Sequence, residues 1–366
     1  MRKLSTPIEY DPAVLIVVIP SARSISLEYL TPLIDAGARF IVVDDSEGTI
    51  DISHPQFAVY TWKDQDRLLG DRVHAIPRGN GACRDFGFYI AWRESDPGEI
   101  VIALDDDCLV DDADFAAHVE AALEPGARPQ AAGEGRHFNI LDCYSNAEND
   151  IFPRGFPYSA RADYRPWTFD GQASGDVQFN LGLWRGIFDV NAVDKLRGPR
   201  YEYQDAELSS ASVVIPDGAL VSVCSMNMQF RRELIPAAYQ LLMNVEVMPG
   251  WVIDRYGDIW GGFILKTLMD ARGDRMSVGG PMIRHLKEGS YERNIWQEHV
   301  CHLVNDEFVG IVLAARASVR SGDYVSMAAQ FWEHVEAQLS HCSAILRRYL
   351  EHQLPAVRMW TELLAR

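Results

Sequence analysis

Three consecutive aspartates at the end of an apolar run are the strongest chemical signal in this sequence. Asp105, Asp106 and Asp107 directly follow the apolar residues 100–104. Side chains at positions i and i+2 of an extended segment point to the same side, so Asp105 and Asp107 can offer two carboxylates to one cation. Hard oxygen ligands of this kind suit Mg²⁺ or Mn²⁺ bridging a diphosphate. A solvated acidic turn is the alternative, but the preceding strand-like run favours a metal site.

A histidine and three arginines could complete such a site. His285 follows a strand-like segment and offers a nitrogen ligand, which favours Mn²⁺ over Mg²⁺, although a structural histidine has the same sequence signal. Arg84 lies in the first turns of a helix predicted after residues 79–81, where free backbone N–H groups attract anions. Arg154 and Arg161 lie in a proline-rich segment, and guanidinium groups suit bidentate phosphate contacts. For each arginine a surface ion pair is the alternative.

Aromatic and acidic residues in the second half of the chain suit a sugar. Trp184 follows a Gly-Leu pair, and Asp258 lies two residues before Trp260. A sugar ring packs on an aromatic face while a carboxylate binds its hydroxyl groups, although core packing would explain both tryptophans equally well. Asp176, Asp189 and Asp258 are the carboxylates that could serve as a general acid or base. The sequence does not choose among these three.

The composition excludes several classes of protein. The formal net charge of −18 argues against nucleic-acid binding, which depends on clustered Lys and Arg. The same charge repels nucleotide diphosphates, so such a substrate needs local positive potential from a cation and arginines. No apolar run approaches the roughly 20 residues of a membrane helix, and polar residues 9–11 make the N-terminus a poor signal peptide. We therefore predict a cytoplasmic protein whose six scattered cysteines are buried, reduced thiols.

The first third of the chain alternates strand and helix patterns. Apolar runs and helical spacing predict strands at 14–19, 40–43, 57–60 and 100–104, and helices at 28–36, 82–92 and 111–123. This alternation is typical of an α/β protein with a doubly wound parallel sheet. Ligands of such sheets bind outside the carboxyl ends of the strands, which is where the aspartate triplet lies.

The pattern changes after residue 130. A stretch rich in Gly, Pro and aromatic residues predicts a long irregular functional loop at 131–212. Beyond it we expect two short strands within 213–223, helices at 232–243 and 258–271, and a largely helical region from 295 whose last helix breaks at Pro355. We divide the chain into a nucleotide-sugar domain, residues 1–300, and a C-terminal helical extension, residues 301–366. The extension could pack on the core or form a homo-oligomer interface.

Several of these segments, in the same order, resemble the reversibly glycosylated polypeptide family, whose plant members are UDP-arabinopyranose mutases. The matching blocks span about residues 13 to 300 and are IVVIPS (16–21), ACRDFG (82–87), LDDDC (104–108), RGFPYSAR (154–161), GLW (182–184), IPDG (215–218), CSMNM (224–228), RYGDIW (255–260) and His285. Any one block is weak evidence for the resemblance, whereas the whole set of blocks in the same order is specific to the family.

The resemblance implies a glycosyltransferase-A (Rossmann-like) fold with a mostly parallel sheet and a divalent cation, Mn²⁺ or Mg²⁺. It also implies interconversion of the pyranose and furanose forms of a nucleotide-diphosphate sugar without flavin. Carried over by position, residues 105–107 are the family's DxD motif. Arg154 matches the arginine that becomes glycosylated and is needed for activity, and Arg161 matches the second arginine of that motif.

Two departures from the plant pattern fall near the expected sugar site. Plant members carry Ser-His where this chain has Asn180-Leu181, and an Asp where it has Gly257. Both point away from arabinose and towards the bacterial branch of the family. That branch includes a mutase that converts GDP-L-fucopyranose to GDP-L-fucofuranose in an antibiotic pathway.

We therefore expect a metal-dependent mutase. The cation is held by Asp105, Asp107 and His285, and the substrate by Arg84, Asp105, Asp106, Arg161, Trp184 and Asp258. Arg154 holds the sugar transiently in one of two possible routes, and Asp176 or Asp189 moves a proton between the sugar oxygens O4 and O5. The alternatives are a glycosyltransferase that needs an acceptor and a self-glycosylating nucleotide-sugar-binding protein without turnover.

Overall fold

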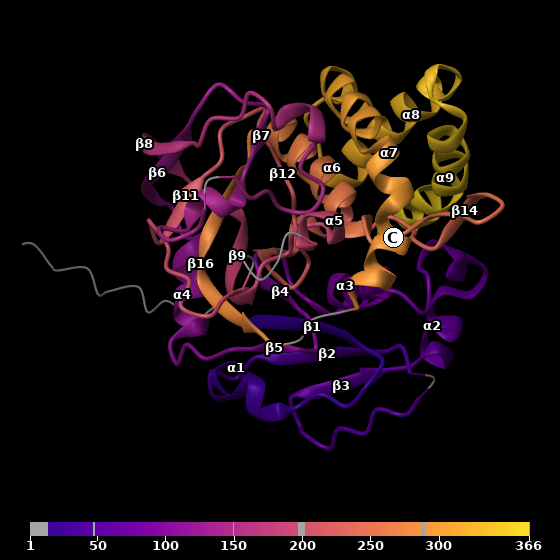
Figure 1. The fold of residues 1–366 in the computed structure, drawn as a ribbon. Helices are drawn as coiled ribbons and strands as arrows, with labels where there is room; N and C mark the ends of the chain where they lie inside the picture. The colour runs from indigo at the N-terminus through magenta and orange to yellow at the C-terminus, as the bar shows by residue number, and fades with distance from the viewer. Residues whose placement is uncertain (1–13, 47, 149, 197–201, 287–289, 366) are drawn as a thin grey trace, which may run out of the picture.

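The structure is a computed structural model that describes residues 14–46, 48–148, 150–196, 202–286 and 290–365 (Figure 1). The N-terminal segment that supports the predicted cytoplasmic location lies outside these residues. Within these ranges, the helices are too short or too polar to cross a membrane. All six cysteines are unpaired and five are buried, as the sequence predicts.

The first third forms the predicted parallel strands. They lie side by side in the order β3-β2-β1-β4 and are β1 (Leu15–Ser21), β2 (Arg39–Asp44), β3 (Phe57–Tyr60) and β4 (Ile100–Leu104). Continuous apolar runs identify β1, β2 and β4 because helices and loops bury both faces of these strands. The helices of this region are α1 (Thr31–Asp35), α2 (Trp62–Leu69), α3 (Arg84–Glu94) and α4 (Phe115–Leu123). Helix α2 was not predicted, and α4 begins four residues later than the predicted helix at 111–123.

The sheet continues from β4 with strands of both directions. Its further members are β5 (Cys108–Leu109), β6 (Gly126–Ala132), β8 (Thr168–Gly175), β9 (Val177–Ile187), β10 (Glu202–Tyr203), β11 (Ser212–Val214), β13 (Asn227–Arg231) and β16 (Arg275–His285). Strand β13 runs antiparallel to both β4 and β9, so β4 and β9 point the same way, and β16 is parallel to β9. The carboxyl ends of β1, β4, β9 and β16 therefore face one side of the molecule. The predicted α/β class and glycosyltransferase-A-like architecture are confirmed.

The prediction of a long irregular loop at 131–212 is wrong. This stretch contains β8, β9 and β10, together with β7 (His137–Phe138) and α5 (Ala192–Lys195). Strand β9 lacks a plain apolar pattern because Asn180 is buried in a hydrogen-bond network, where its amide N–H donates to Gln229 at 2.7 Å. Gly182 lies against the side chain of Asn227 and leaves no room for a Cβ atom. Tertiary contacts, rather than strand propensity, therefore determine this strand.

The predicted helix at 232–243 is also wrong. Only a 3₁₀ turn, Arg232–Ala237, forms, and Pro236 cannot donate a backbone hydrogen bond. The following segment is buried but irregular, because the carboxylate of Asp85 accepts the backbone N–H of Gln240 at 3.1 Å. The short strands β11 and β12 (Leu220–Val221) flank the predicted turn at 216–218, and β12 pairs with β7.

The C-terminal half is mostly helical, as predicted. The elements are the hairpin β14 (Val245–Met248) and β15 (Trp251–Ile253), and the helices α6 (Gly257–Arg272), α7 (Tyr291–Ala315), α8 (Tyr324–Gln338) and α9 (Ala344–Leu364). Pro355 does not break the last helix, because α9 continues through it with Leu354, Ala356 and Val357 buried. Figure 1 shows α7, α8 and α9 gathered beside α6. Helix α7 begins before residue 300 and ends after it, so it crosses the boundary between the two proposed domains.

Candidate active site

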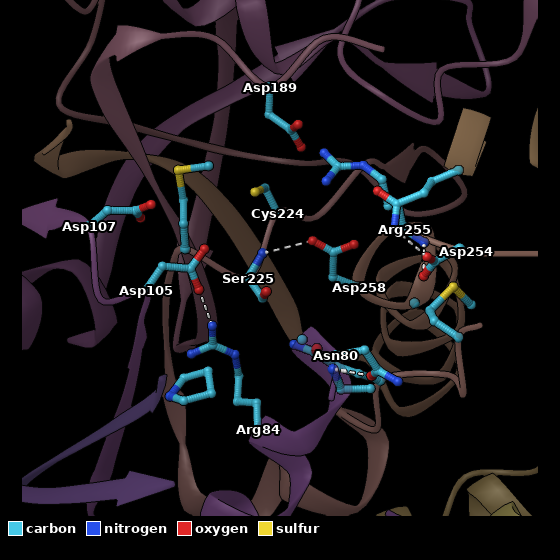
Figure 2. A pocket seen from close by; sticks show the side chains of 18 of the residues that line it. Asn80, Arg84, Asp105, Asp107, Asp189, Cys224, Ser225, Asp254, Arg255 and Asp258 are labelled. Carbon is cyan, nitrogen blue, oxygen red and sulfur yellow. Dashed lines mark hydrogen bonds and ion pairs between the residues drawn. The ribbon is translucent and has the colours of Figure 1, made fainter. Parts of the chain in front are cut away.

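A cavity of about 750 Å³ opens at the carboxyl ends of β1, β4, β9 and β16. The loop before α3, the turn after β15 and the first turns of α6 and α7 complete its walls. Its volume lies within the range of pockets that bind small molecules. Figure 2 shows Asp105 and Asp107 on one side of the cavity, Asp254 and Arg255 on the other, and Asp258 between them.

The acidic triplet is held by donors from two neighbouring segments. Asp105 accepts a hydrogen bond from Arg84, and Asp106 accepts from Ser21 and Arg23. Arg23 also donates to Asp107 at 3.0 Å. Burial, with repulsion from the two neighbouring aspartates, raises the pKa of Asp106 although Ser21 and Arg23 oppose the rise. The triplet is therefore a fixed part of the cavity wall and not a solvated turn.

Arg84 connects the triplet to the sheet. Its guanidinium is fully buried and donates to the strand carbonyls of Val18 at 3.3 Å and Leu104 at 2.8 Å, as well as to Asp105. These hydrogen bonds direct most of its donors towards the protein. Arg84 lines the cavity, but in this structure it orients a carboxylate that faces the substrate space.

His285 lies beside Asp107 and has the geometry of a metal ligand. Its Nε2 is 3.8 Å from Oδ1 of Asp107, and two ligand atoms that share one cation at about 2.1 Å lie roughly 3–4 Å apart. Its Nδ1 lies 3.3 Å from the carbonyl of Ile187, which can only accept, so this contact favours the tautomer with a free lone pair on Nε2. The pairing of β16 with β5, which sets His285 opposite Cys108, produces this arrangement. Asp107 and His285 therefore fit a divalent cation.

The described residues alone do not complete a metal site. Across the described ranges, no group of three or more His, Cys, Asp or Glu side chains converges on one point. Asp105 faces the same cavity as Asp107, but its Oδ1 accepts from Arg84. A cation on Asp107 and His285 would need oxygen atoms from a substrate or water to complete its coordination.

A second charged cluster lies deeper in the cavity. Arg154 donates to both carboxylate oxygens of Asp189, with Nε at 3.1 Å from each and Nη2 at 2.9 Å from one, and to Asp258 at 3.2 Å. Asp189 follows β9 and Asp258 lies in the first turn of α6. Gly155 lets the loop that carries Arg154 approach α6 closely. Its φ of +84° and its contact with Ile259 on α6 leave no room for a side chain.

The two carboxylates of this cluster differ in their pKa. Burial would raise the pKa of Asp189, but the charge and hydrogen bonds of Arg154 outweigh burial and lower it. Burial raises the pKa of Asp258, and Arg154 offsets this only in part because Asp189 repels a second negative charge. Burial would lower the pKa of Arg154, but Asp189 and Asp258 together outweigh burial and hold this pKa well above its usual range. Two neighbouring carboxyl groups with opposite pKa shifts can take different roles in proton transfer.

Three predicted site residues do not line the cavity. Asp176 lies in the exposed turn between β8 and β9. The eleven residues of β9, at about 3.3 Å each, separate it from Asp189. Trp184 is fully buried and its indole N–H donates to the carbonyl of Ile187. Arg161 pairs with Asp194 at 2.9 Å and stacks on Tyr158, so it stabilises the loop that carries Arg154.

The two departures from the plant pattern have different surroundings. Asn180 and Leu181 are buried within β9, and neither lines the cavity. Gly257 does line it, at the start of α6. Only the change at Gly257 can therefore act directly on a substrate.

The cavity also contains residues that the sequence analysis did not single out. They include Arg23, Lys195, Cys224, Asn244 and Arg255. Arg23 and Cys224 lie within or beside the matching family blocks, and Arg255 opens one of them. The position of each block was therefore a usable signal for these three, whereas Lys195 and Asn244 carry no comparable pattern.

The fold defines a glycosyltransferase-A-like α/β protein, with a candidate active site in the cavity at the carboxyl edge of the sheet. The chain belongs to the reversibly glycosylated polypeptide family, whose family model matches residues 11–365. It is 26% identical over 355 residues to UDP-arabinopyranose mutase 1 of Arabidopsis thaliana, covering 95% of this chain and 92% of that protein. It is 27% identical over 373 residues to UDP-arabinopyranose mutase 1 of Oryza sativa subsp. japonica, covering 98% and 93%.

A third relative, UDP-arabinopyranose mutase 3 of Arabidopsis thaliana, is 30% identical over 290 residues, covering 77% of this chain and 73% of the relative. These relatives and the family match identify the chain as an enzyme of the isomerase class, a mutase. The family assignment made from the ordered sequence blocks is confirmed.

Proposed function

We propose that this mutase interconverts the pyranose and furanose forms of a nucleotide-diphosphate sugar. The observation that supports this most directly is the cluster in which Arg154 lies between Asp189 and Asp258, in the same cavity as the acidic triplet. One end of the cavity suits a diphosphate and the deeper end offers paired carboxyl groups for proton transfer. The relatives named above act on UDP-arabinopyranose.

UDP-L-arabinopyranose is therefore the first substrate to test. GDP-L-fucopyranose stays a prediction. The substitution at Asn180-Leu181 that favoured this substrate lies inside the sheet and does not line the cavity, so it cannot contact the sugar directly. Gly257 remains the one departure that could change the shape of the sugar site.

At the diphosphate end, Asp107 and His285 would hold Mn²⁺ or Mg²⁺. The bound cation would neutralise the charge that develops on the diphosphate as it leaves the sugar. Asp105 is oriented by Arg84 towards the same space, and Arg23 compensates the charge of Asp106 and Asp107. In a chain with a net charge of −18, the two arginines compensate most of the charge of the three aspartates, and a bound divalent cation would make the local potential positive, so that an anionic substrate can enter.

At the sugar end, ring contraction needs one proton to move and no electrons. The bond between C1 and the diphosphate oxygen breaks, and O4 attacks C1 and gives up its proton to a carboxylate. The result is a bicyclic sugar with both O4 and O5 bonded to C1. The diphosphate then attacks C1, the C1–O5 bond breaks, and O5 takes the proton back from the carboxyl group. The reaction is balanced without flavin or any other redox cofactor.

We assign the proton transfer to Asp258. Its raised pKa suits a group that must hold a proton between two steps, whereas Asp189 is kept ionised by two hydrogen-bonding nitrogens of Arg154. Asp176, the other sequence candidate, lies outside the cavity.

Arg154 acts in this scheme as a fixed cation beside the developing charge. A guanidinium must lose a proton before it can attack C1, and the two carboxylates oppose that loss by raising its pKa. This favours the route through O4 over a covalent arginine–sugar intermediate. It also argues against the self-glycosylating protein without turnover.

The test is to incubate the enzyme with Mn²⁺ and UDP-L-arabinopyranose, or GDP-L-fucopyranose, and to follow ring size by NMR. A mutase forms the furanose without any acceptor, whereas a glycosyltransferase forms product only when an acceptor is added. Removal of the cation with EDTA should stop the reaction. Full activity in EDTA, or product that requires an acceptor, would contradict the proposal.

A further inference from the structure

Two residues of the cavity adopt a backbone conformation that side chains disfavour. Asn244 has a φ of 60° and Arg255 a φ of 64°, and in the described part of the chain they are the only residues other than glycine with positive φ. Both line the cavity, at the two ends of the β14–β15 hairpin. Asn tolerates this conformation, but Arg does so at a cost. Such strain is concentrated at functional sites, where the side chain is needed in one place.

Arg255 is held through its Nε nitrogen, and within the described residues its two terminal nitrogens remain available to a ligand. Its Nε donates to Oε1 of Glu298 at 3.0 Å, and Oε2 of the same buried glutamate accepts the backbone N–H of Ala192 at 2.9 Å. Neither Nη nitrogen of Arg255 donates to a described residue. The side chain is one-third exposed and contributes to the lowered pKa of Asp189, so its charge acts within the cavity.

The other cavity arginines described above pair with aspartates that also line the cavity. Arg84 donates to Asp105, Arg23 to Asp106 and Asp107, and Arg154 to Asp189 and Asp258. Their positive charges are therefore balanced by acids of the same cavity. Arg255 instead has its carboxylate partner outside the cavity lining, on the buried side of α7. It lies across the cavity from Asp105 and Asp107 (Figure 2).

We propose that Arg255 binds the diphosphate of the substrate through its two terminal nitrogens, with Glu298 as the residue that positions it. This inference rests on the proposed function and adds a second contact on the side of the diphosphate away from the acidic triplet. The edge of the planar guanidinium formed by the two terminal nitrogens, which have no partner among the described residues, matches two phosphate oxygens, whereas a neutral sugar hydroxyl does not require a cation. The strained backbone and the ion pair with Glu298 fix the guanidinium in advance, which lowers the entropic cost of binding.

The test compares the affinities of UDP, inorganic pyrophosphate and uridine for the wild type and two variants, by titration calorimetry. Arg255→Gly removes the side chain and relieves the backbone, and Arg255→Gln keeps the backbone cost but removes the charge. Each should weaken UDP and pyrophosphate by about 10- to 100-fold, the value of a hydrogen bond to a charged group, and leave uridine unchanged. If the base proves to be guanine, GDP and guanosine replace UDP and uridine.

Arg358→Ala is the matched control, because it removes an exposed arginine that pairs with Glu336 on α8 and does not line the cavity. It should bind UDP as the wild type does. Wild-type affinity for UDP in Arg255→Gln would overturn the inference, and so would an equal loss of uridine and UDP affinity, which indicates a collapsed loop. Loss of affinity for UDP-arabinopyranose with UDP unchanged would assign Arg255 to the sugar and also overturn it. If the wild type binds neither UDP nor GDP and has no mutase activity, the proposed function itself fails.

Discussion

The charge balance around Arg154 can be tested without any substrate by the substitution Arg154→Met. Methionine keeps an unbranched side chain but removes the cation. The side chains of Arg154, Asp189 and Asp258 are only 7%, 11% and 13% exposed, so the two carboxylates would face each other in a poorly hydrated site. Removal of one partner from a buried ion pair costs about 3–5 kcal/mol of unfolding free energy.

The loss should depend on pH, and its direction follows from the pKa shifts. In the wild type, the lowered pKa of Asp189 gives stability that is present above its unfolded value, about 3.9, and is lost as pH falls through its folded pKa. Asp258 acts in the opposite sense. Because its pKa is raised, the folded state keeps the proton up to a higher pH than the unfolded state does, so stability is lost as pH rises. Without Arg154 both pKa values should lie above the unfolded value. The stability of the variant should therefore fall as pH rises, with its largest deficit at alkaline pH.

The assay is urea unfolding of the wild type and Arg154→Met at about pH 5 and about pH 8, on either side of the expected carboxyl titration. The double variant Arg154→Met/Asp189→Asn removes one of the two negative charges that repel each other. It should therefore recover part of the lost stability and show a weaker pH dependence. Wild-type stability of Arg154→Met at pH 8, or a deficit that is the same at both pH values, would refute the reasoning.

Four further substitutions test other parts of the site. Asp258→Asn should lower kcat by about 10²- to 10⁴-fold, whereas Asp176→Asn should keep wild-type kinetics, and the reverse pattern would reassign the proton carrier. His285→Ala should weaken the thermal stabilisation that Mn²⁺ gives in the presence of UDP, and an unchanged Mn²⁺ titration would remove His285 from the metal site. Gly155→Ala should destabilise the fold by about 2–5 kcal/mol, from left-handed backbone and overpacking against Ile259, as measured by urea unfolding. Equal stability would show that the loop can relax.

The sequence predicts the elements whose burial is simple. Strands β1, β2 and β4 are buried on both faces and read as apolar runs, and α6 has one uninterrupted helical pattern. Strand β9 escaped prediction because a buried Asn180 and the tightly packed Gly182 are explained only by partners on other strands. The continuation of α9 through Pro355 likewise depends on tertiary packing, which offsets the missing hydrogen bond.

The site was predictable where a residue lies at a strand end or inside an ordered block. The structure brings Asp105, Asp107 and His285 to one wall, and Arg154 to the deeper cluster. Arg161 was assigned to the substrate because it shares a block with Arg154, but side-chain direction in an irregular segment cannot be read from spacing. The family block that begins with Arg255 was a signal for this position, but its backbone conformation could not be predicted, since a positive φ in a residue other than glycine leaves no mark in the sequence.

The way α9 reaches the cavity wall has a consequence for protein synthesis. The backbone N–H and carbonyl of Leu242, two residues before the strained Asn244, are both bonded to the side-chain amide of Gln353. A chain still attached to the ribosome lacks this partner until α9 has emerged, so one wall of the site stays unfinished while the first strands can already pair. Emergence of α9, and not completion of the sheet, then completes this wall of the site.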